Sequence, residues 1–464
     1  MDYALEDDEK TRTSGSAGRC GAVLTDPATP TTHCSNRFGS LTRYHRPRAV
    51  RRPRFARSPP ERPEVVTSRP PGEVIVIANP SPDVYGSDLQ MLESVSAMVE
   101  RGWAVVVAMP RDGALGEMIR SRGAEVRIVD FPVLRRTSAS PREFATMVAH
   151  GARSVWTIIR TLRDVRPAVV YVNTVTLPWW LLAARLSRVP CVCHVHEAET
   201  KDRRLVRVAL NTPLMLANAF IVISRSSLDA TCDAAPYLRK RAHLIYNGVP
   251  GPTQPPAAST MATDRPIRLA VVGRLSPRKA PDLALETVAL LRRRHRDVVI
   301  QLCGTPFAGY EWYADQLRER ARQPDLAGAV GWPGYVSPIW PVMSHAHIVL
   351  APSLREPFGN AVVEAQLSQR PVVATAALGH LETIADGETG LLVPEGDINA
   401  FAAAVERLID DPAFARRVAA AGRQLAIQRF SPTRYRAEIV GLIQSLIDHR
   451  NGPSRWRRLG RQQR

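Results

Sequence analysis

The stretch EPFGNAVVEAQ, residues 356–366, places two carboxylates around a predicted strand-to-helix turn. The apolar run before it, residues 347–352, is typical of a short buried strand, and residues 361–368 have the spacing of a helix. Glu356 falls in the turn, and Glu364 follows one to two helical turns later. Ligands of open α/β sheets bind at such turns, beyond the carboxyl ends of the strands. The stretch therefore predicts both an α/β fold and a ligand site.

The same turn offers hydrogen-bond donors as well as acceptors. Gly359 and the free amides of the first helical turn suit an anionic or hydroxyl-rich ligand, and the two glutamates can accept hydrogen bonds from different parts of one polyhydroxylated molecule. The alternative is that Glu364 caps its helix or complements the helix dipole. With Asn360 as the cap residue, a capping box needs an acid at position 363, which is valine. A binding role is therefore favoured.

Short β-branched runs alternate with amphipathic stretches on both sides of this turn. A first series of predicted strands covers residues 74–78, 104–108, 125–129, 168–172, 191–195, 219–223 and 242–246, and a second covers 267–272, 298–302, 329–331, 348–350 and 371–375. Strands that are apolar at nearly every position are covered on both faces, as in doubly wound parallel sheets. The predicted fold class is α/β, with two Rossmann-like domains facing across a crevice.

The length of 464 residues exceeds one ordinary domain, and a hydrophobic content of 45% suffices for two cores. We predict an Arg- and Pro-rich tail at 1–72, a first domain at 73–248, a linker at 249–265, a second domain at 266–431, a closing helix at 432–449 and a basic tail at 450–464. Both tails lack an apolar period, so we expect them to be disordered.

The formal net charge of +18 is concentrated in the two tails. Basic segments of this kind bind anionic lipid headgroups, whereas no base-stacking pattern or reader motif supports nucleic-acid binding. A merely solubilising tail is the alternative. The first ten residues do not resemble a secretory signal, and no apolar run is long enough to span a membrane. We expect a cytoplasmic protein that associates with the inner face of a membrane.

Six cysteines are scattered along the chain, and Cys191 and Cys193 form the one close pair. With His194 and His196 they suggest a zinc site, but alternation along a strand points the two kinds of ligand to opposite faces. We therefore predict no metal site and buried thiols. No GxGxxG or P-loop signature follows a predicted strand, which favours a nucleotide-linked ligand other than a dinucleotide.

Two further turns carry charged or polar groups at the predicted ligand edge. Gly273, Arg274 and Lys279 follow the first strand of the second domain, where two cations beside a helix N-terminus suit a diphosphate. A solvated basic turn is the alternative. In the first domain, Gly86 follows the first strand, in a loop that is equally well read as inert. His196 ends the fifth strand, where it can donate a hydrogen bond to a substrate hydroxyl or exchange protons near neutral pH, while His194 is predicted to be a satisfied core residue.

These residues resemble the retaining glycosyltransferases of family 4, which have the GT-B architecture. The resemblance covers residues 73–448. Its most specific parts are EPFG at 356–359 with Glu364, Gly273 and Arg274 with Lys279, and GETGLLVPEGD at 387–397. It implies a nucleotide-diphosphate sugar as donor substrate, no cofactor and no metal. The abundance of Arg, Ala and Pro is typical of a GC-rich bacterial genome with an elaborate envelope, so we expect a glycan or glycolipid of the cell envelope as the acceptor.

The resemblance also implies individual roles. Arg274 and Lys279 would hold the diphosphate and stabilise its departure, Glu356 would bind the donor sugar, and Glu364 would bind the ribose. The amides of Phe358, Gly359 and Asn360 would assist Glu356, His196 would lie beside the transferred sugar, and Gly86 near the donor phosphates. The closing helix would cross back to the first domain.

The sequence departs from the family pattern at two positions. Tyr85 precedes a single Gly86 where paired glycines are common, and Ala280 follows Lys279 where glycine is common. Neither change removes a charged group, so we expect an active hexosyltransferase. The rivals are a nucleotide-sugar epimerase of the same fold, a phosphorylase, which would need a longer chain and a pyridoxal phosphate lysine, and a catalytically silent binding protein.

Overall fold

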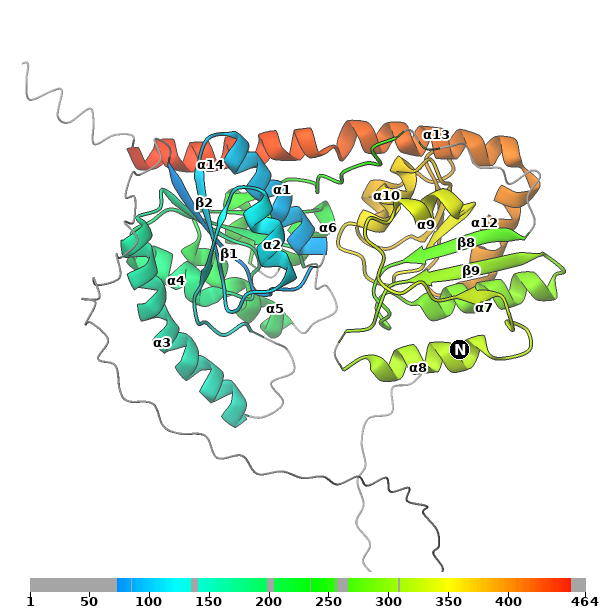
Figure 1. Cartoon of the computed structure of the whole chain (residues 1–464), viewed down its shortest axis with the longest axis horizontal. Helices are drawn as coiled ribbons and strands as arrows, with labels where there is room; N and C mark the ends of the chain where they lie inside the picture. The colour runs from blue at the N-terminus through cyan, green and yellow to red at the C-terminus, as the bar shows by residue number, and fades with distance from the viewer. Residues whose placement is uncertain are drawn as a thin grey trace, which may run out of the picture. The chain divides into compact units, whose positions relative to one another are not determined.

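The computed structural model describes residues 73–451 except 85, 135–140, 198–203, 234, 255, 257–265 and 308. Its strands form two parallel sheets, which lie on either side of the predicted linker in the sequence (Figure 1). The predicted tail at 1–72 and residues 452–464 lie outside the described residues. The predicted two-sheet α/β fold is confirmed.

The first sheet has seven strands in the order β3-β2-β1-β4-β5-β6-β7. Its strands are β1 (Val74–Ala78), β2 (Ala104–Met109), β3 (Glu125–Ile128), β4 (Val169–Val172), β5 (Cys191–Val195), β6 (Ala219–Val222) and β7 (Ala242–Leu244). Alternate residues of β1 enter different hydrophobic clusters, with Val76 packed on one side and Ile75 on the other. Both faces of the sheet are therefore covered, as the continuous apolar runs predict.

The second sheet has six strands in the order β10-β9-β8-β11-β12-β13. These are β8 (Ile267–Val272), β9 (Val298–Cys303), β10 (Val330–Gly331), β11 (Ile348–Ala351), β12 (Val372–Thr375) and β13 (Leu391–Val393). The sequence reading missed β13, because three apolar residues between loops are too few to show a period. The last strand extends the sheet beside β12.

Helices connect the strands in both halves, as parallel sheets require. In the first half they are α1 (Gly86–Glu100), α2 (Ala114–Ser121), α3 (Pro141–Val165), α4 (Pro178–Leu186), α5 (Arg204–Asn211) and α6 (Arg225–Cys232), with the 3-10 turns η1 (Thr212–Leu216) and η2 (Pro236–Arg241). In the second they are α7 (Pro281–Arg293), α8 (Glu311–Ala321), α9 (Trp340–His345), α10 (Asn360–Leu367), α11 (His380–Thr383), α12 (Ile398–Asp410) and α13 (Pro412–Arg429).

The last helix, α14 (Pro432–Asn451), packs against α1 of the first half (Figure 1). Tyr435 is fully buried there, and its hydroxyl lies 2.6 Å from the Ser94 hydroxyl. Arg436 forms a 2.7 Å ion pair with Glu93. Arg450, assigned to the tail from the sequence, lies in this helix and donates to the Pro167 carbonyl over 2.9 Å. The C-terminal helix is thus part of the first half's core.

Candidate functional site

The turn after β8 begins with a glycine whose conformation other residues adopt with strain. Gly273 has φ of 152°, and its carbonyl oxygen lies so near Gly304 that a Cβ built on Gly304 would approach it to 1.8 Å. Two loops at the carboxyl edge of the sheet therefore meet backbone to backbone. The two loops lie too close at this point for a side chain on Gly304, and the chain continues from Gly273 to Lys279.

Lys279 and Glu356 form an ion pair across two turns of this edge. Their side chains are 22% and 11% exposed, so water screens the pair only in part. Burial by itself would raise the pKa of the Glu356 carboxyl. The Lys279 ammonium, assisted by His380 and Arg278, outweighs burial and lowers this pKa to about 2. Glu356 is therefore a firmly ionised acceptor at neutral pH.

Glu364 lies on α10, half-buried, and has the opposite electrostatic setting. Burial raises the pKa of its carboxyl to about 7, although the charge of Lys279 acts in the other direction. One ammonium thus influences both carboxylates, but it pairs directly with Glu356 only. At neutral pH the site holds one fixed negative charge and one carboxyl that titrates.

The helix α10 begins one residue earlier than the sequence suggested. Gly359, with φ of 104°, is the N-cap residue, and Asn360 is the first residue of the helix. The expectation that Asn360 caps the helix is therefore wrong, because the left-handed conformation of Gly359 already turns the chain. No side chain caps this terminus, which leaves amides of the first turn available at the site.

The His380 ring packs against the turn at Gly359, and the sequence analysis did not single out this histidine. A Cβ built on Gly359 would lie 2.9 Å from the His380 ring. The neighbouring Gly379 amide donates a hydrogen bond to the Glu356 carbonyl over 2.8 Å. His380 is buried, and its Nδ1 lies 3.0 Å from the Thr375 carbonyl. Burial lowers its pKa, so the ring is a neutral support. Its position just after the strand at 371–375 was the available signal, since that strand ends at the same edge.

Phe358 points away from the polar edge. It is 2% exposed, and its ring packs edge-on against Phe430, with 5.3 Å between the ring centroids. A Cβ on Gly379 would approach the Phe358 backbone to 2.4 Å, so the two loops are in close contact. The side chain thus anchors the turn, and only the backbone of Phe358 remains for a ligand.

Arg274 stacks on an aromatic residue that the sequence analysis did not single out. Its guanidinium carbon lies 3.5 Å from the centroid of the Phe307 ring, in the loop after β9. Such stacking holds the planar guanidinium group in one orientation. Phe307 was overlooked because a single aromatic in a loop has no periodic signal.

Gly86 lies beside the first turn of α10, although it belongs to the first half of the chain. A Cβ built on Gly86 would lie 3.5 Å from Asn360 Nδ2, and Asn247 Nδ2 donates to Asn360 Oδ1 over 2.9 Å. The structure therefore brings the predicted residues Gly86 and Asn360 together. Tyr85, which departs from the family pattern, lies outside the described residues.

A second contact between the halves is made by Glu382, which the sequence analysis also missed. Its carboxylate accepts hydrogen bonds from the amides of Arg225 and Ser226, at 2.9 and 3.1 Å, in the first turn of α6. The Tyr246 hydroxyl donates to the same group over 2.9 Å. A carboxylate at a helix N-terminus is favoured by the helix dipole, so this contact joins α11 to α6.

His196 follows the end of β5. Its Nε2 lies 3.0 Å from Asn173 Oδ1, and burial lowers its pKa to about 4. Of the two roles predicted for His196, this lowered pKa favours hydrogen bonding over proton exchange near neutral pH. Within the described residues, His196 forms no hydrogen bond with Lys279, Glu356 or Glu364.

His194 is buried, as predicted, but only half satisfied. The Tyr171 hydroxyl contacts its Nδ1, whereas Nε2 is buried with no hydrogen-bond partner. Cys191 and Cys193 are buried free thiols on the same strand. Over the part of the chain that the structure describes, no group of three His, Cys, Asp or Glu residues is placed to hold a metal ion.

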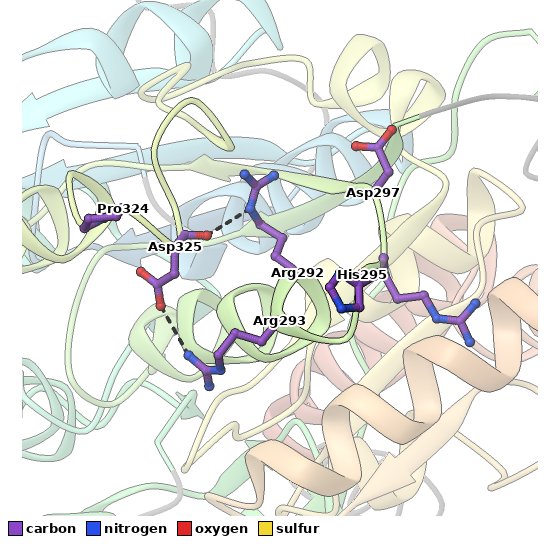
Figure 2. Close-up of a pocket in the computed structure, with 7 residues that line it drawn as sticks. Arg292, Arg293, His295, Asp297, Pro324 and Asp325 are labelled. Atoms are coloured by element: carbon purple, nitrogen blue, oxygen red, sulfur yellow. Dashed lines mark hydrogen bonds and ion pairs between the residues drawn. The ribbon is translucent and has the colours of Figure 1, made fainter.

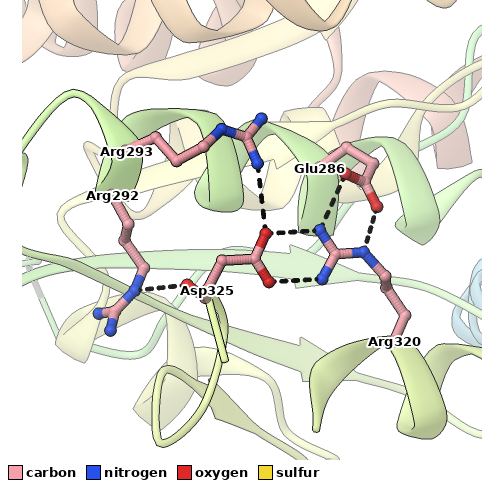
Figure 3. A network of polar contacts seen from close by, with 5 residues as sticks. All are labelled: Glu286, Arg292, Arg293, Arg320 and Asp325. Carbon is pink, nitrogen blue, oxygen red and sulfur yellow. Dashed lines mark hydrogen bonds and ion pairs between the residues drawn. The ribbon is translucent and has the colours of Figure 1, made fainter. Parts of the chain in front are cut away.

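A shallow cavity of about 420 Å³ lies at the opposite edge of the second sheet, at the amino end of β9 (Figure 2). It is lined by Arg292, Arg293, His295, Arg296, Asp297, Pro324 and Asp325. The arginines that line it have partners: Arg292 donates to the Asp325 carbonyl, Arg293 pairs with the Asp325 carboxylate, and Arg296 pairs with Asp410. Asp325 also pairs with Arg320, which pairs in turn with Glu286 (Figure 3). This network ties α7 to α8, and it lies away from the carboxyl edge that carries the predicted ligand residues.

None of the described helices is both long and apolar enough to cross a lipid bilayer.

Two family descriptions match the sequence, "Glycosyltransferase Family 4" over residues 86–250 and "Glycosyl transferases group 1" over residues 258–425. Glycogen synthase of Mycobacterium tuberculosis is 30% identical over 283 residues, which make up 57% of this chain and 65% of that protein. A D-inositol 3-phosphate glycosyltransferase of Nocardioides sp. is 33% identical over 170 residues, 34% of this chain and 37% of that protein. The chain thus spans under two thirds of either curated relative.

Solved structures share the two-sheet architecture. The Anabaena protein HepE in complex with UDP and glucose superimposes with a TM-score of 0.67 at 21% identity, over 80% of this chain and 100% of that one. Sucrose-phosphate synthase from Thermosynechococcus elongatus gives a TM-score of 0.66 at 20% identity, over 81% and 100% of the two chains. At these identities the likeness establishes the GT-B fold. Together with the two sequence matches, one on each sheet, it confirms the predicted family: the chain belongs to the glycosyltransferases of family 4.

Proposed function

We propose that this protein is a retaining glycosyltransferase that moves a sugar from a nucleotide-diphosphate donor to a hydroxyl acceptor. The observation that carries the proposal is the setting of Lys279, which pairs with Glu356 and also acts on Glu364 at an uncapped helix N-terminus. Such an edge offers cations and amides to a diphosphate and two acceptors to sugar hydroxyls. The roles of Arg274, Lys279, Glu356 and Glu364 that follow are part of the proposal.

In the proposed reaction the bond from the anomeric carbon to the diphosphate oxygen breaks, and a bond to the acceptor oxygen forms on the same face. The proton of the acceptor hydroxyl passes to the departing phosphate oxygen. Arg274 and Lys279 stabilise the negative charge that develops on the diphosphate. Glu356 is a poor covalent nucleophile because Lys279 holds its charge, so it serves as an acceptor for the hydroxyls of the donor sugar.

Protein cations fill the role that a divalent metal has in other nucleotide-sugar enzymes, so the proposed reaction is independent of metal. Arg274 is preorganised by its stack on Phe307, which favours fork-like binding of a phosphate. We expect turnover to persist in the presence of a chelator. Loss of turnover in EDTA that Mg²⁺ restores would contradict this part of the proposal.

The acceptor is proposed to be a glycan or glycolipid of the cell envelope, reached at the inner face of the membrane. Support for the location comes from the sequence alone, through the arginine-rich segments at both ends. Deleting residues 1–72 and 452–464 should reduce sedimentation with anionic liposomes while transfer to a soluble acceptor persists. Unchanged sedimentation would remove the membrane from the proposal.

The decisive experiment is a panel of nucleotide-sugars tested for thermal stabilisation and for release of the nucleoside diphosphate. One donor should raise the melting temperature by mass action and should be cleaved. NMR of the product should show that the anomeric configuration of the donor is kept. Conversion of the free nucleotide-sugar without an acceptor would indicate an epimerase, and no binding by any donor would favour a silent binding protein.

A further inference from the structure

In the first half of the molecule, a series of hydrogen bonds connects His196 to buried side chains at the ends of β4 and β1. The proposed reaction does not use these side chains. Asn173 Oδ1 lies 3.0 Å from His196 Nε2, and Asn173 Nδ2 donates to Asn79 Oδ1 over 2.7 Å. Asn79 Nδ2 donates in turn to Asp88 Oδ1 and to the Ser81 carbonyl, each over 2.9 Å. Asn79, Asp88 and Asn173 are at most 2% exposed. Buried side-chain amides of this kind must be paired.

The direction of every bond in the chain is fixed at its inner end. A backbone carbonyl has no proton to give, so the Asn79 group that faces the Ser81 carbonyl is its NH₂. The second hydrogen of that NH₂ group is donated to Asp88 Oδ1 over 2.9 Å. Both Asn79 amide hydrogens are therefore committed, and its Oδ1 must accept. Asn173 must then turn its own amide nitrogen toward Asn79, which leaves Asn173 Oδ1 facing His196. An amide oxygen can only accept, so His196 carries its proton on Nε2.

The backbone holds these side chains where the argument needs them. Asn79 follows β1 and Asn173 follows β4, and their amides continue the ladder by donating to Ala108 and Ala78 carbonyls, each over 2.9 Å. The His196 amide donates to the Glu197 carboxylate over 2.9 Å, and the ring packs 4.0 Å from that of His194, centroid to centroid. The imidazole is thus fixed in both orientation and tautomer.

We propose that Asn79 and Asn173, anchored by Asp88, are positioning residues that hold His196 as the Nε2–H tautomer and leave Nδ1 as a hydrogen-bond acceptor. No described residue bonds Nδ1. The substrate group that meets this atom must therefore be a donor, which on a sugar is a hydroxyl, so a carboxylate or a fluorine at that position is rejected. This last clause rests on the proposed function, whereas the tautomer does not.

Selective ¹⁵N labelling of histidine tests the tautomer in the free protein, without any substrate. Long-range proton–nitrogen spectra distinguish Nε2–H from Nδ1–H, and His196→Ala identifies the signal. Native protein should show a single Nε2–H form at pH 7. Asn173→Leu removes the acceptor and should give a mixture of the two tautomers. Asn218→Leu, at the opposite end of β5, where Asn218 Oδ1 accepts from the Cys191 amide, should leave the signal unchanged.

The same variants separate positioning from folding. Once a donor is known, Asn173→Leu should lower kcat/KM about tenfold while Asn218→Leu changes it little. A donor analogue lacking the matching hydroxyl should lose about as much with native enzyme and nothing further with Asn173→Leu. An Nδ1–H form in the native spectrum, or an Asn173→Leu spectrum that equals the native one, would overturn the proposal. The native spectrum decides even if the variant does not fold.

Discussion

The two sheets end in edges of opposite character. The carboxyl edge of the second sheet is built from charges, where the Lys279 ammonium pairs with an ionised Glu356 and also acts on a titrating Glu364. At the corresponding edge of the first sheet, the side-chain amides of Asn79 and Asn173 lead to a His196 ring that burial keeps neutral. Charges bind and stabilise an anion, whereas neutral relays fix the direction of single hydrogen bonds. One edge is thus suited to a diphosphate and the other to orienting a hydroxyl.

Removing the central cation should have the largest effect. Lys279→Ala is expected to lower kcat/KM by about 10²–10³-fold, the usual effect of losing one donor that stabilises transition-state charge. Glu356 also loses its partner, so its pKa should rise from about 2. Steady-state kinetics with the identified donor measure the first effect. Lys240→Ala, an exposed lysine on η2, is the matched control. Equal activity of the two variants would refute the charged edge.

Placing a carboxylate beside His196 should make the carboxyl edge of the first sheet charged, like that of the second sheet. Asn173→Asp places a carboxylate beside His196 Nε2, which lies 3.0 Å from Asn173 Oδ1 in the native protein, and this favours the imidazolium. The variant also loses the NH₂ group that donates to Asn79 Oδ1. The pKa of His196, lowered to about 4 in the native protein, should rise by roughly 1–3 units. Histidine NMR titration measures the shift, with the signal of His243 as internal reference. A pKa that stays near 4 would show that burial alone sets it.

The third effect concerns the stability cost of Glu364. Its folded pKa of about 7 lies above the reference value of 4.5, so the folded protein binds the extra proton between these values. The carboxylate therefore lowers stability progressively as pH rises through that window. Glu364→Gln should stabilise the free protein by on the order of 1–2 kcal/mol at pH 8, after allowance for partial exposure, and by almost nothing near pH 4.5.

Urea unfolding at the two pH values measures this difference. Glu388→Gln, an exposed carboxyl in the loop before β13, serves as the control. A Glu364→Gln variant that is equally stable relative to native protein at both pH values would mean that the carboxyl is well solvated.

The smallest effect should come from the contact that joins the halves. Glu382→Gln keeps one carbonyl oxygen for the α6 amides but offers an NH₂ group where the carboxylate accepted a second bond. We expect the free energy of unfolding to fall by about 0.5–1 kcal/mol, which is typical of a weakened helix cap. Denaturant unfolding measures it, with exposed Glu395→Gln for comparison. An unchanged midpoint would show that this contact is not a stabilising one.

Much of the fold could be predicted because each strand is a local pattern. The twelve predicted strands all appear, with ends shifted by two residues or fewer, and the miss is β13, where three residues carry no period. The charged edge was also predictable in kind. Lys279 and Glu356 lie in turns that follow strands, and Glu364 lies on the helix after the second of these turns. Charged residues at such loop positions have few structural reasons to be there.

The sequence by itself determined the two parallel sheets, the family and the types of residue at the charged edge, because these depend on local patterns and on motifs. Only the tertiary structure decided how those residues act. Asn173 reaches Asn79 across 94 positions of sequence, and Glu382 reaches α6 across 157. Asparagine at a strand end has no signature of its own, since its role depends on what faces it. Likewise the sequence left hydrogen bonding and proton exchange open as roles for His196, and burial, which no short motif reveals, lowers its pKa to about 4.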